Sequence, residues 1–308
     1  MKNAPPLALI AGPTASGKSA LALALAECTG GVIVNADSAQ IYRDLPVISA
    51  APTAEDRSRA DHRLYAICDG ADPCSAADWA RLAKAEIADI HSSGRLPILV
   101  GGTGLYLRTL LEGIAPVPTI DRRVRDRVRT RPVDDNRAEL EKVDPAAAER
   151  LHSGDSTRIA RALEVVLSTG RPLADWQGRR EGGIGASIDL KPLVLLPPRE
   201  WLYERCDRRF EEMVEAGAVD EVKALLAREL DPSLPVMRAI GVREIAAFFS
   251  GEIDRDEMIA RGQQATRNYA KRQYTWFAHQ PPAHWPRFTG ELTEVALPQA
   301  LALLHSRA

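Results

Sequence analysis

Residues Gly12–Ser19 read GPTASGKS, and this stretch decides the class of fold. The spacing G-x-x-x-x-G-K-S is that of a P-loop, in which backbone N–H groups close around a phosphate while a lysine and a hydroxyl complete the site. The apolar run PLALIA precedes it, and an alanine- and leucine-rich stretch follows it as far as a glycine stop. Strand, glycine loop and helix in this order predict an α/β domain with a parallel sheet.

The P-loop also predicts which side chains meet a phosphate. We expect Lys18 to neutralise phosphate oxygens and Ser19 to ligate Mg²⁺, with the N-terminus of the following helix facing the anion. The whole loop is expected to form the diphosphate or nucleotide site: Gly12, Pro13, Thr14, Ala15, Ser16, Gly17, Lys18 and Ser19.

The acidic residue that holds Mg²⁺ in most P-loop NTPases has no obvious counterpart. It would end a neighbouring strand, but the apolar run ILVGG ends in glycines. The only acid at a suitable strand end is Asp37, in NADSAQIY. From the residues alone, Asp37 is equally well interpreted as a helix cap, a magnesium ligand or a catalytic group.

Two further apolar runs, GVIVNADS and RLPILVGG, predict additional parallel strands. Ligands bind at the carboxyl ends of such strands, so we expect Gly12–Ser19, Asp37 and Thr103 to face one cleft. From about Asp121 the sequence becomes charged and helix-forming, and LKPLVLLPP then resumes an apolar strand. We therefore predict a P-loop core of residues 1–119 and 186–308, interrupted by an all-helical insertion of residues 120–185.

The charge, the cysteine pattern and the apolar runs of the chain limit which classes of partner it can have. The formal net charge is −2, yet the stretch Asp121–Arg131 (DRRVRDRVRTR) concentrates arginines, so an anionic polymer is not excluded. The four cysteines show no CxxC pairing and no histidine in ligand spacing, which indicates neither a zinc site nor a disulfide framework. Without an apolar run of membrane-spanning length, we expect a soluble, cytoplasmic protein with no membrane partner.

Two C-terminal segments carry cationic side chains, and in the second of them aromatic residues are interleaved. MRAIGVREI offers Arg238 and Arg243 around a glycine, although arginines on a helix are usually only solvated. QQATRNYAKRQYTWF interleaves basic and aromatic residues, which suits nucleic acid but equally suits an ordinary amphipathic helix.

Taken together, these segments resemble the tRNA dimethylallyltransferase family, also called tRNA isopentenyltransferases. The similarity runs in order over nearly the whole chain, through GPTASGKS, ADSAQIYRDL, DHRLYAICD, SAADWARLA, GRLPILVGGTGLYLRTLLEG, VDPAAAERLHSGDSTRIARALEV, MRAIGVREI and ATRNYAKRQYTWF. The chain resembles the shorter bacterial members, because it ends without the zinc finger common in eukaryotic ones.

The resemblance implies a Mg²⁺-dependent enzyme that transfers the dimethylallyl group of dimethylallyl diphosphate to N6 of the adenosine just 3′ of the tRNA anticodon. It implies that Gly12–Ser19 hold the diphosphate, that Asp37 is the general base and that Arg238 meets the diphosphate. It also implies a monomer whose helical insertion grips the anticodon arm. The tRNA contacts implied by the match are Asp37, Ser38, Ala39, Gln40, Thr103, Arg125, Thr157, Arg158, Ile159, Ala160, Arg161, Gln263, Gln264, Ala265, Thr266 and Arg267.

Two departures from the family pattern concern possible substrate contacts. Where the family usually reads IGTAKP, this chain reads VISAAP, so Ile48 replaces a glycine and Ala51 a lysine. The family's TWFR is TWFA here, ending in Ala278.

Three alternative functions remain to be separated by experiment. An adenylate isopentenyltransferase would use the same chemistry on a free nucleotide, but it would have little use for an arginine-rich helical insertion. A small-molecule kinase would use ATP at the P-loop with Asp37 as base. A nucleotide switch would bind ATP or GTP without turnover, and the missing strand-end acid argues against both of these.

Overall fold

The computed structural model describes residues 4–305 and divides the chain into two compact units. The first unit runs to Leu110 and resumes at Ile184, and the second comprises Leu111–Gly183. The insertion expected at residues 120–185 thus lies almost wholly within the second unit.

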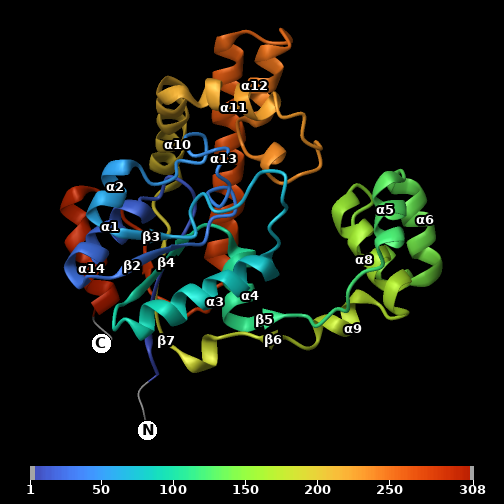
Figure 1. The fold of residues 1–308 in the computed structure, drawn as a ribbon, viewed down its shortest axis with the longest axis horizontal. Coiled ribbons are helices and arrows are strands. Elements are labelled where there is room, and N and C mark those ends of the chain that lie inside the picture. Colours follow the sequence, from blue (N-terminus) through green and yellow to red (C-terminus); the bar gives the residue numbers. More distant parts are fainter. Residues whose placement is uncertain (1–3, 306–308) are drawn as a thin grey trace. The chain divides into compact units, whose positions relative to one another are not determined.

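A six-stranded sheet in the order β3-β2-β4-β1-β7-β8 forms the centre of the first unit (Figure 1). Within the described residues, all of its strand pairings are parallel, which confirms the predicted α/β class. The strands are β1 (Pro6–Ala11), β2 (Val32–Asn35), β3 (Asp61–Arg63), β4 (Pro97–Gly101), β7 (Asp189–Leu195) and β8 (Arg287–Phe288).

The P-loop strand β1 lies inside the sheet. It pairs with β7 from Pro6↔Asp189 to Ala11↔Val194, and with β4 from Ala8↔Ile98 to Ala11↔Gly101. A central parallel strand is covered on both faces, so its sequence is continuously apolar rather than alternating. This explains why PLALIA buries every residue after Pro6.

Helices cover both faces of the sheet. The chain moves from β1 to β2 in one direction and from β3 to β4 in the other, so right-handed crossovers place α1 (Lys18–Thr29) and α3 (Ala76–Ser92) on opposite faces. The side chains of α1 and α14 (Leu297–His305) share one apolar cluster with Ile10, Val100 and Leu195.

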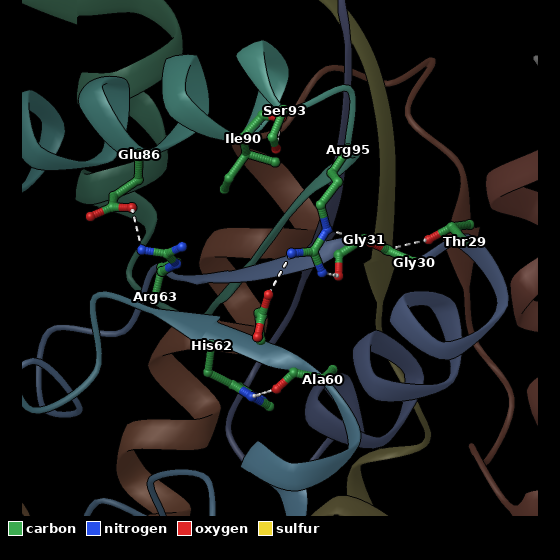
Figure 2. Close-up of polar contacts among 11 residues, drawn as sticks. Thr29, Gly30, Gly31, Ala60, His62, Arg63, Glu86, Ile90, Ser93 and Arg95 are labelled. Atoms are coloured by element: carbon green, nitrogen blue, oxygen red, sulfur yellow. Dashed lines mark hydrogen bonds and ion pairs between the residues drawn. The ribbon is translucent and has the colours of Figure 1, made fainter.

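The sheet edge at β3 is held by charged side chains rather than by apolar burial (Figure 2). Arg95 donates to the carbonyl oxygens of Gly30 and Gly31 at 2.8 and 3.2 Å and forms an ion pair with Asp61 of β3. Arg63 faces Glu86 at 3.7 Å. These contacts fix a three-residue edge strand that the apolar pattern did not reveal.

The remaining helices of the first unit come from both of the chain segments that form it, the one before and the one after the second unit. In the first segment these are α2 (Ala54–Arg59) and α4 (Gly104–Glu112), and Trp79 of α3 stacks on Tyr106 of α4. The C-terminal segment contains α10 (Arg199–Met213), the π-helix η2 (Val214–Ala218), α11 (Val219–Leu226), the short η3 (Val236–Arg238), α12 (Val242–Phe249) and α13 (Arg255–His279). Of the helices in residues 4–305, none combines the length and apolarity needed to cross a membrane.

The second unit is helical, as predicted, apart from a two-residue antiparallel pairing of β5 (Gly113–Ile114) with β6 (Glu181–Gly182). Its core joins Val128, Leu140, Ile159 and Leu163. The helices are α5 (Arg122–Thr130), α6 (Val133–Val143), α7 (Pro145–Arg150), α8 (Ser156–Thr169) and α9 (Leu173–Gln177). Asp121 and Asp155 cap α5 and α8 by accepting from backbone N–H groups.

Candidate active site

A cavity of about 220 Å³ lies where β1 and β2 end, at the edge of the sheet at which parallel α/β folds bind ligands. Several polar residues line it from different parts of the first unit, among them Thr14 of the P-loop, Asp37 and Ser38 after β2, Arg209 of α10 and Arg238 of η3. Apolar side chains also line it, including Phe210, Met213 and Ile240. The cavity can therefore receive a molecule that has both a charged part and an apolar part.

The P-loop is held in the conformation that an anion site requires. Gly12 has a φ of 152°, and a Cβ added there would lie 2.6 Å from the carbonyl oxygen of Leu195. Ala15 also has a positive φ, of 61°, and its carbonyl accepts a hydrogen bond from Arg205 Nε at 2.9 Å. The hydroxyl of Ser16 is buried and has no hydrogen-bond partner among residues 4–305. The Ser16 hydroxyl is therefore available to form a hydrogen bond with a ligand.

Lys18 bends back over the loop. Its Nζ donates to the carbonyl of Pro13 at 2.6 Å. Removal from water lowers the pKa of Lys18 to about 8, although the nearby Asp37 carboxylate opposes this shift. The positive charge on Lys18 is therefore costly to keep until an anion arrives.

Ser19 is the residue predicted to ligate Mg²⁺. Among residues 4–305, no three His, Cys, Asp or Glu side chains converge on a common metal position. Mg²⁺ is usually held by one or two protein oxygens together with substrate phosphates, so an all-protein cage is not needed. Ser19 is exposed in the first turn of α1, at the end of the P-loop.

Asp37 is fixed by its neighbours in a tight turn. Its backbone N–H donates to Asn35 Oδ1 at 2.7 Å, and Asn35 Nδ2 donates to the Asp37 carbonyl at 3.0 Å. One carboxylate oxygen, Oδ1, accepts from the N–H of Ala39 at 3.0 Å. This single turn contact leaves the carboxylate with acceptor capacity toward the cavity.

The structure places Thr103 against the residues on either side of Asp37, although Thr103 is not among the residues that line the cavity. Thr103 Oγ1 accepts from the N–H of Ser38 at 3.0 Å and lies 3.3 Å from its hydroxyl. The backbone N–H of Thr103 donates to the carbonyl of Ala36 at 3.3 Å. The turns after β2 and β4 therefore form one rigid polar wall.

Arg209 is a site residue that the sequence analysis missed. It lines the cavity beside Asp37, and burial lowers its pKa while the Asp37 carboxylate opposes that shift. A guanidinium stays charged even so. The available signal was the pair Arg205 and Arg209, four residues apart beside the buried stripe of α10. Arg238, which the family match indicated, is exposed at η3 but lines the same cavity.

Tyr269 of α13 was missed as well. It lines the cavity, and burial, together with the charge on Asp37, raises the pKa of its phenol. Gln273, one turn further along α13, was also overlooked, although it contacts the P-loop directly.

The family match also indicated tRNA contacts on α13. The structure places some of these residues at the cavity, some against α10 and some at the surface. Thr266 lines the cavity. Gln263 donates to Glu211 at 2.7 Å, and Arg267 pairs with Asp207 at 2.5 and 2.6 Å, so both tie α13 to α10. Gln264 is exposed and Ala265 is half-buried.

Gln40 makes hydrogen bonds to the loop of residues 47–52, which departs from the family pattern. Gln40 Nε2 donates to the carbonyls of Ser49 and Ala50 at 3.0 and 2.7 Å. From the other side, Glu221 of α11 accepts from the N–H groups of Val47 and Ile48 at 2.7 and 2.8 Å. The loop is thereby fixed with Ile48 lining the cavity.

In the second unit, the predicted tRNA residues lie on α5 and α8. Arg125, Thr157 and Arg158 are exposed, and Arg158 faces Asp155 at 3.5 Å. Arg161 is partly buried, which lowers its pKa. Ile159 is fully buried in the core of the unit, so its side chain supports the fold, while Ala160 is half-buried.

Comparison with known proteins gives one consistent result. The family model described as IPP transferase matches residues 40–280. The tRNA dimethylallyltransferase of Erythrobacter litoralis is 63% identical over 288 residues, covering 92% of this chain and 91% of that protein. That of Sphingopyxis alaskensis is 61% identical, covering 93% and 94%.

Solved structures agree. The tRNA isopentenylpyrophosphate transferase of Bacillus halodurans superposes with a TM-score of 0.69 at 31% identity, covering 98% of this chain and 97% of that one. A eukaryotic dimethylallyltransferase acting on tRNA gives 0.76 at 29% identity, covering 88% and 69%. With such matches over most of its length, the chain belongs to the IPP transferase family.

Proposed function

We propose that this protein transfers the dimethylallyl group of dimethylallyl diphosphate to N6 of the adenosine immediately 3′ of the tRNA anticodon. The observation that carries the proposal is the cavity in which the P-loop, the Asp37 carboxylate and two guanidinium groups meet. Membership of the IPP transferase family, with curated relatives named tRNA dimethylallyltransferase, supports the same conclusion.

The cationic residues of the site suit the diphosphate. Arg209 and Arg238 line the cavity, and Lys18 lies at the N-terminus of α1 within electrostatic reach of Arg209. In the proposed complex these three cationic side chains bind the diphosphate. Negative charge on the leaving diphosphate grows as the C1–O bond breaks. These cations therefore stabilise the transition state more than the bound donor.

The acceptor amine needs a base. The lone pair of adenine N6 is delocalised into the ring, so the amine becomes nucleophilic only as its proton is withdrawn. In the transfer, N6 forms a bond to C1 of the donor, C1–O breaks, diphosphate leaves with the bonding electrons and Asp37 accepts the N6 proton. Asn35 accepts from the backbone N–H of Asp37 and Ala39 donates to its carboxylate, and these two contacts hold Asp37 in place for this proton.

Mg²⁺, bound through Ser19 and the donor phosphates, would add positive charge on the leaving group. The apolar lining residues Phe210, Met213 and Ile240 would hold the hydrocarbon part of the donor away from water. Excluding water there protects an allylic diphosphate from hydrolysis.

Reaching N6 requires the target base to leave its stack, and an anticodon loop offers the least costly place to do so. The exposed arginines of the helical unit, including Arg125 and Arg158, are suited to hold RNA phosphates. We propose the anticodon arm as their partner and a monomer as the acting species.

The test supplies the protein with Mg²⁺, radiolabelled dimethylallyl diphosphate and either bulk tRNA or AMP. Label in tRNA alone, mapped by nuclease digestion to the adenosine after the anticodon, is the expected result. Label in AMP would favour an adenylate isopentenyltransferase. No transfer, together with ATP hydrolysis or ATP-dependent phosphorylation, would instead favour a kinase.

A further inference from the structure

Gln273 lies between the P-loop and the turn that follows β4. It is 6% exposed, and both ends of its side-chain amide are used. Oε1 accepts from the backbone N–H of Thr14 at 2.8 Å, and Nε2 donates to the carbonyl of Gly102 at 2.9 Å. One side chain from α13 thus bridges two loops far apart in the sequence.

The turn is shaped to receive this amide. A Cβ added to Gly102 would lie 2.3 Å from Nε2 of Gln273 and 3.1 Å from the carbonyl oxygen of Gly12. Only glycine lets the P-loop, the amide and the turn meet this closely. The bridge therefore requires two residues: Gln273, which makes the hydrogen bonds, and Gly102, which leaves room for its amide.

The two bridged loops serve opposite halves of the proposed reaction. The P-loop faces the donor diphosphate, and Thr14 lines the cavity. The turn continues into Thr103, whose hydroxyl binds the N–H of Ser38, next to Asp37. A chain of hydrogen bonds therefore runs from the donor site through Gln273 to the turn that carries the base.

The contact with Thr14 has a further meaning. In a P-loop the backbone N–H groups are the phosphate ligands. Here the N–H of Thr14 is occupied by a protein side chain. The N–H of Thr14 therefore serves to position the loop against Gln273 rather than to bind phosphate.

We infer that Gln273 is a positioning residue that sets the distance between the diphosphate site and the acceptor site of the prenyl transfer. This inference rests on the proposed function. Because a misplacement of about 1 Å can cost roughly 100-fold in rate, losing the bridge should slow the chemical step while leaving each substrate's binding contacts in place.

The test compares Gln273→Met and Gln273→Glu with wild type. Methionine keeps the length of the side chain and removes both hydrogen bonds. Glutamate keeps the acceptor for Thr14 but sets a carboxylate oxygen against the Gly102 carbonyl. Gln280→Met makes the same chemical change at the C-cap of α13. Ile90→Ala opens space in the buried face of α3 and serves as a control for lost stability.

Single-turnover transfer is measured at saturating donor and tRNA, well below the unfolding temperature of every variant, together with the two dissociation constants. Both Gln273 variants should lose about 10- to 100-fold in rate, with dissociation constants within about threefold of wild type. Both controls should keep the wild-type rate. An unchanged rate in Gln273→Met, or a loss equal to that of Ile90→Ala, would overturn the inference.

Hydrogen exchange of the substrate-free protein separates this inference from the proposed function. Gln273→Met should speed exchange of the Thr14 amide and of residues 101–104 more than Ile90→Ala does. Unchanged protection would overturn the bridge itself, whatever reaction is catalysed. If the bridge is present but wild type labels no tRNA, the proposed function fails instead, and with it the role in transfer.

Discussion

The backbone N–H of Asp37 donates to the side-chain oxygen of Asn35 at 2.7 Å, and Asn35 is completely buried. Asn35 also donates to the carbonyls of Asp37 and Leu64, both at 3.0 Å. The proposed base is therefore held by a residue inside the core at the end of β2. This arrangement makes substitutions of Asp37 interpretable, because its backbone position does not depend on its own carboxylate.

Asp37→Asn should keep this turn and lower the rate of transfer by ~10²- to 10⁴-fold, because the amide cannot accept the N6 proton. Single-turnover transfer at saturating tRNA and donor, over a Mg²⁺ series, is the measurement. Donor and tRNA affinities should persist. If high Mg²⁺ restores most of the rate, Asp37 is a metal ligand and the assignment as a base is wrong.

Donor binding should depend on the protonation of Lys18. The pKa of Lys18 is about 8 without donor, and only the protonated amine attracts the diphosphate. Affinity is therefore full below pH 8 and falls above it, by up to about tenfold per pH unit, because binding then requires proton uptake. Donor dissociation constants from pH 7 to 10 test this. Lys18→Arg should give a flatter profile, because arginine stays charged. A flat wild-type profile would contradict it.

Arg125→Gln and Arg158→Gln should each weaken tRNA binding and reduce the slope of log K against log salt by about one phosphate contact. Both side chains are exposed on the helical unit. The measurement is a tRNA titration at several salt concentrations. Arg59→Gln is the matched control, since Arg59 is an exposed arginine of the first unit that pairs with Glu27. Equal slopes in all four proteins would show that Arg125 and Arg158 are merely solvated.

Glu221→Gln should lower the free energy of unfolding by ~1–3 kcal/mol, because an amide cannot accept from both Val47 and Ile48 and leaves one N–H without an acceptor. Burial raises the pKa of Glu221, so the folded state holds this proton more tightly than the unfolded chain. Wild-type stability from this group therefore declines as the pH rises from the ordinary glutamate value through the raised one.

Urea denaturation between pH 4 and 8 checks the Glu221 prediction, with exposed Glu215→Gln as control. The deficit of Glu221→Gln relative to wild type should be larger at pH 4 than at pH 8. A deficit that grows with pH would contradict the assigned direction of the pKa shift.

The sequence was sufficient for the core of the fold because strong local patterns encode it. The apolar run before Gly12 and the helix after Lys18 became β1 and α1, and the strand predicted at LKPLVLLPP became β7. The short strands β3 and β8 escaped prediction, since a strand of two or three residues has no periodicity to detect. Arg95 and Asp61, which hold β3, lie far apart in the sequence.

The candidate site was predictable where it lies on motifs. Thr14, Asp37 and Arg238 were identified in advance, and the structure places all three around one cavity. Arg209 and Gln273 lie on amphipathic helices without a motif. Their positions depend on how α10 and α13 pack against each other and against the P-loop, which no local pattern specifies. The family resemblance is confirmed, while the roles of the individual residues remain predictions.

The pairing of β1 with β7 has a consequence for biosynthesis. The partners Pro6 and Asp189 are separated by the entire helical unit, so the central strand stays half unpaired until the ribosome has made β7. The helical unit, whose core joins only nearby residues such as Val128 and Leu163, can fold before then. The middle of this chain is therefore expected to acquire its structure before its beginning, and the exposed edge of β1 is what a nascent-chain chaperone would need to protect.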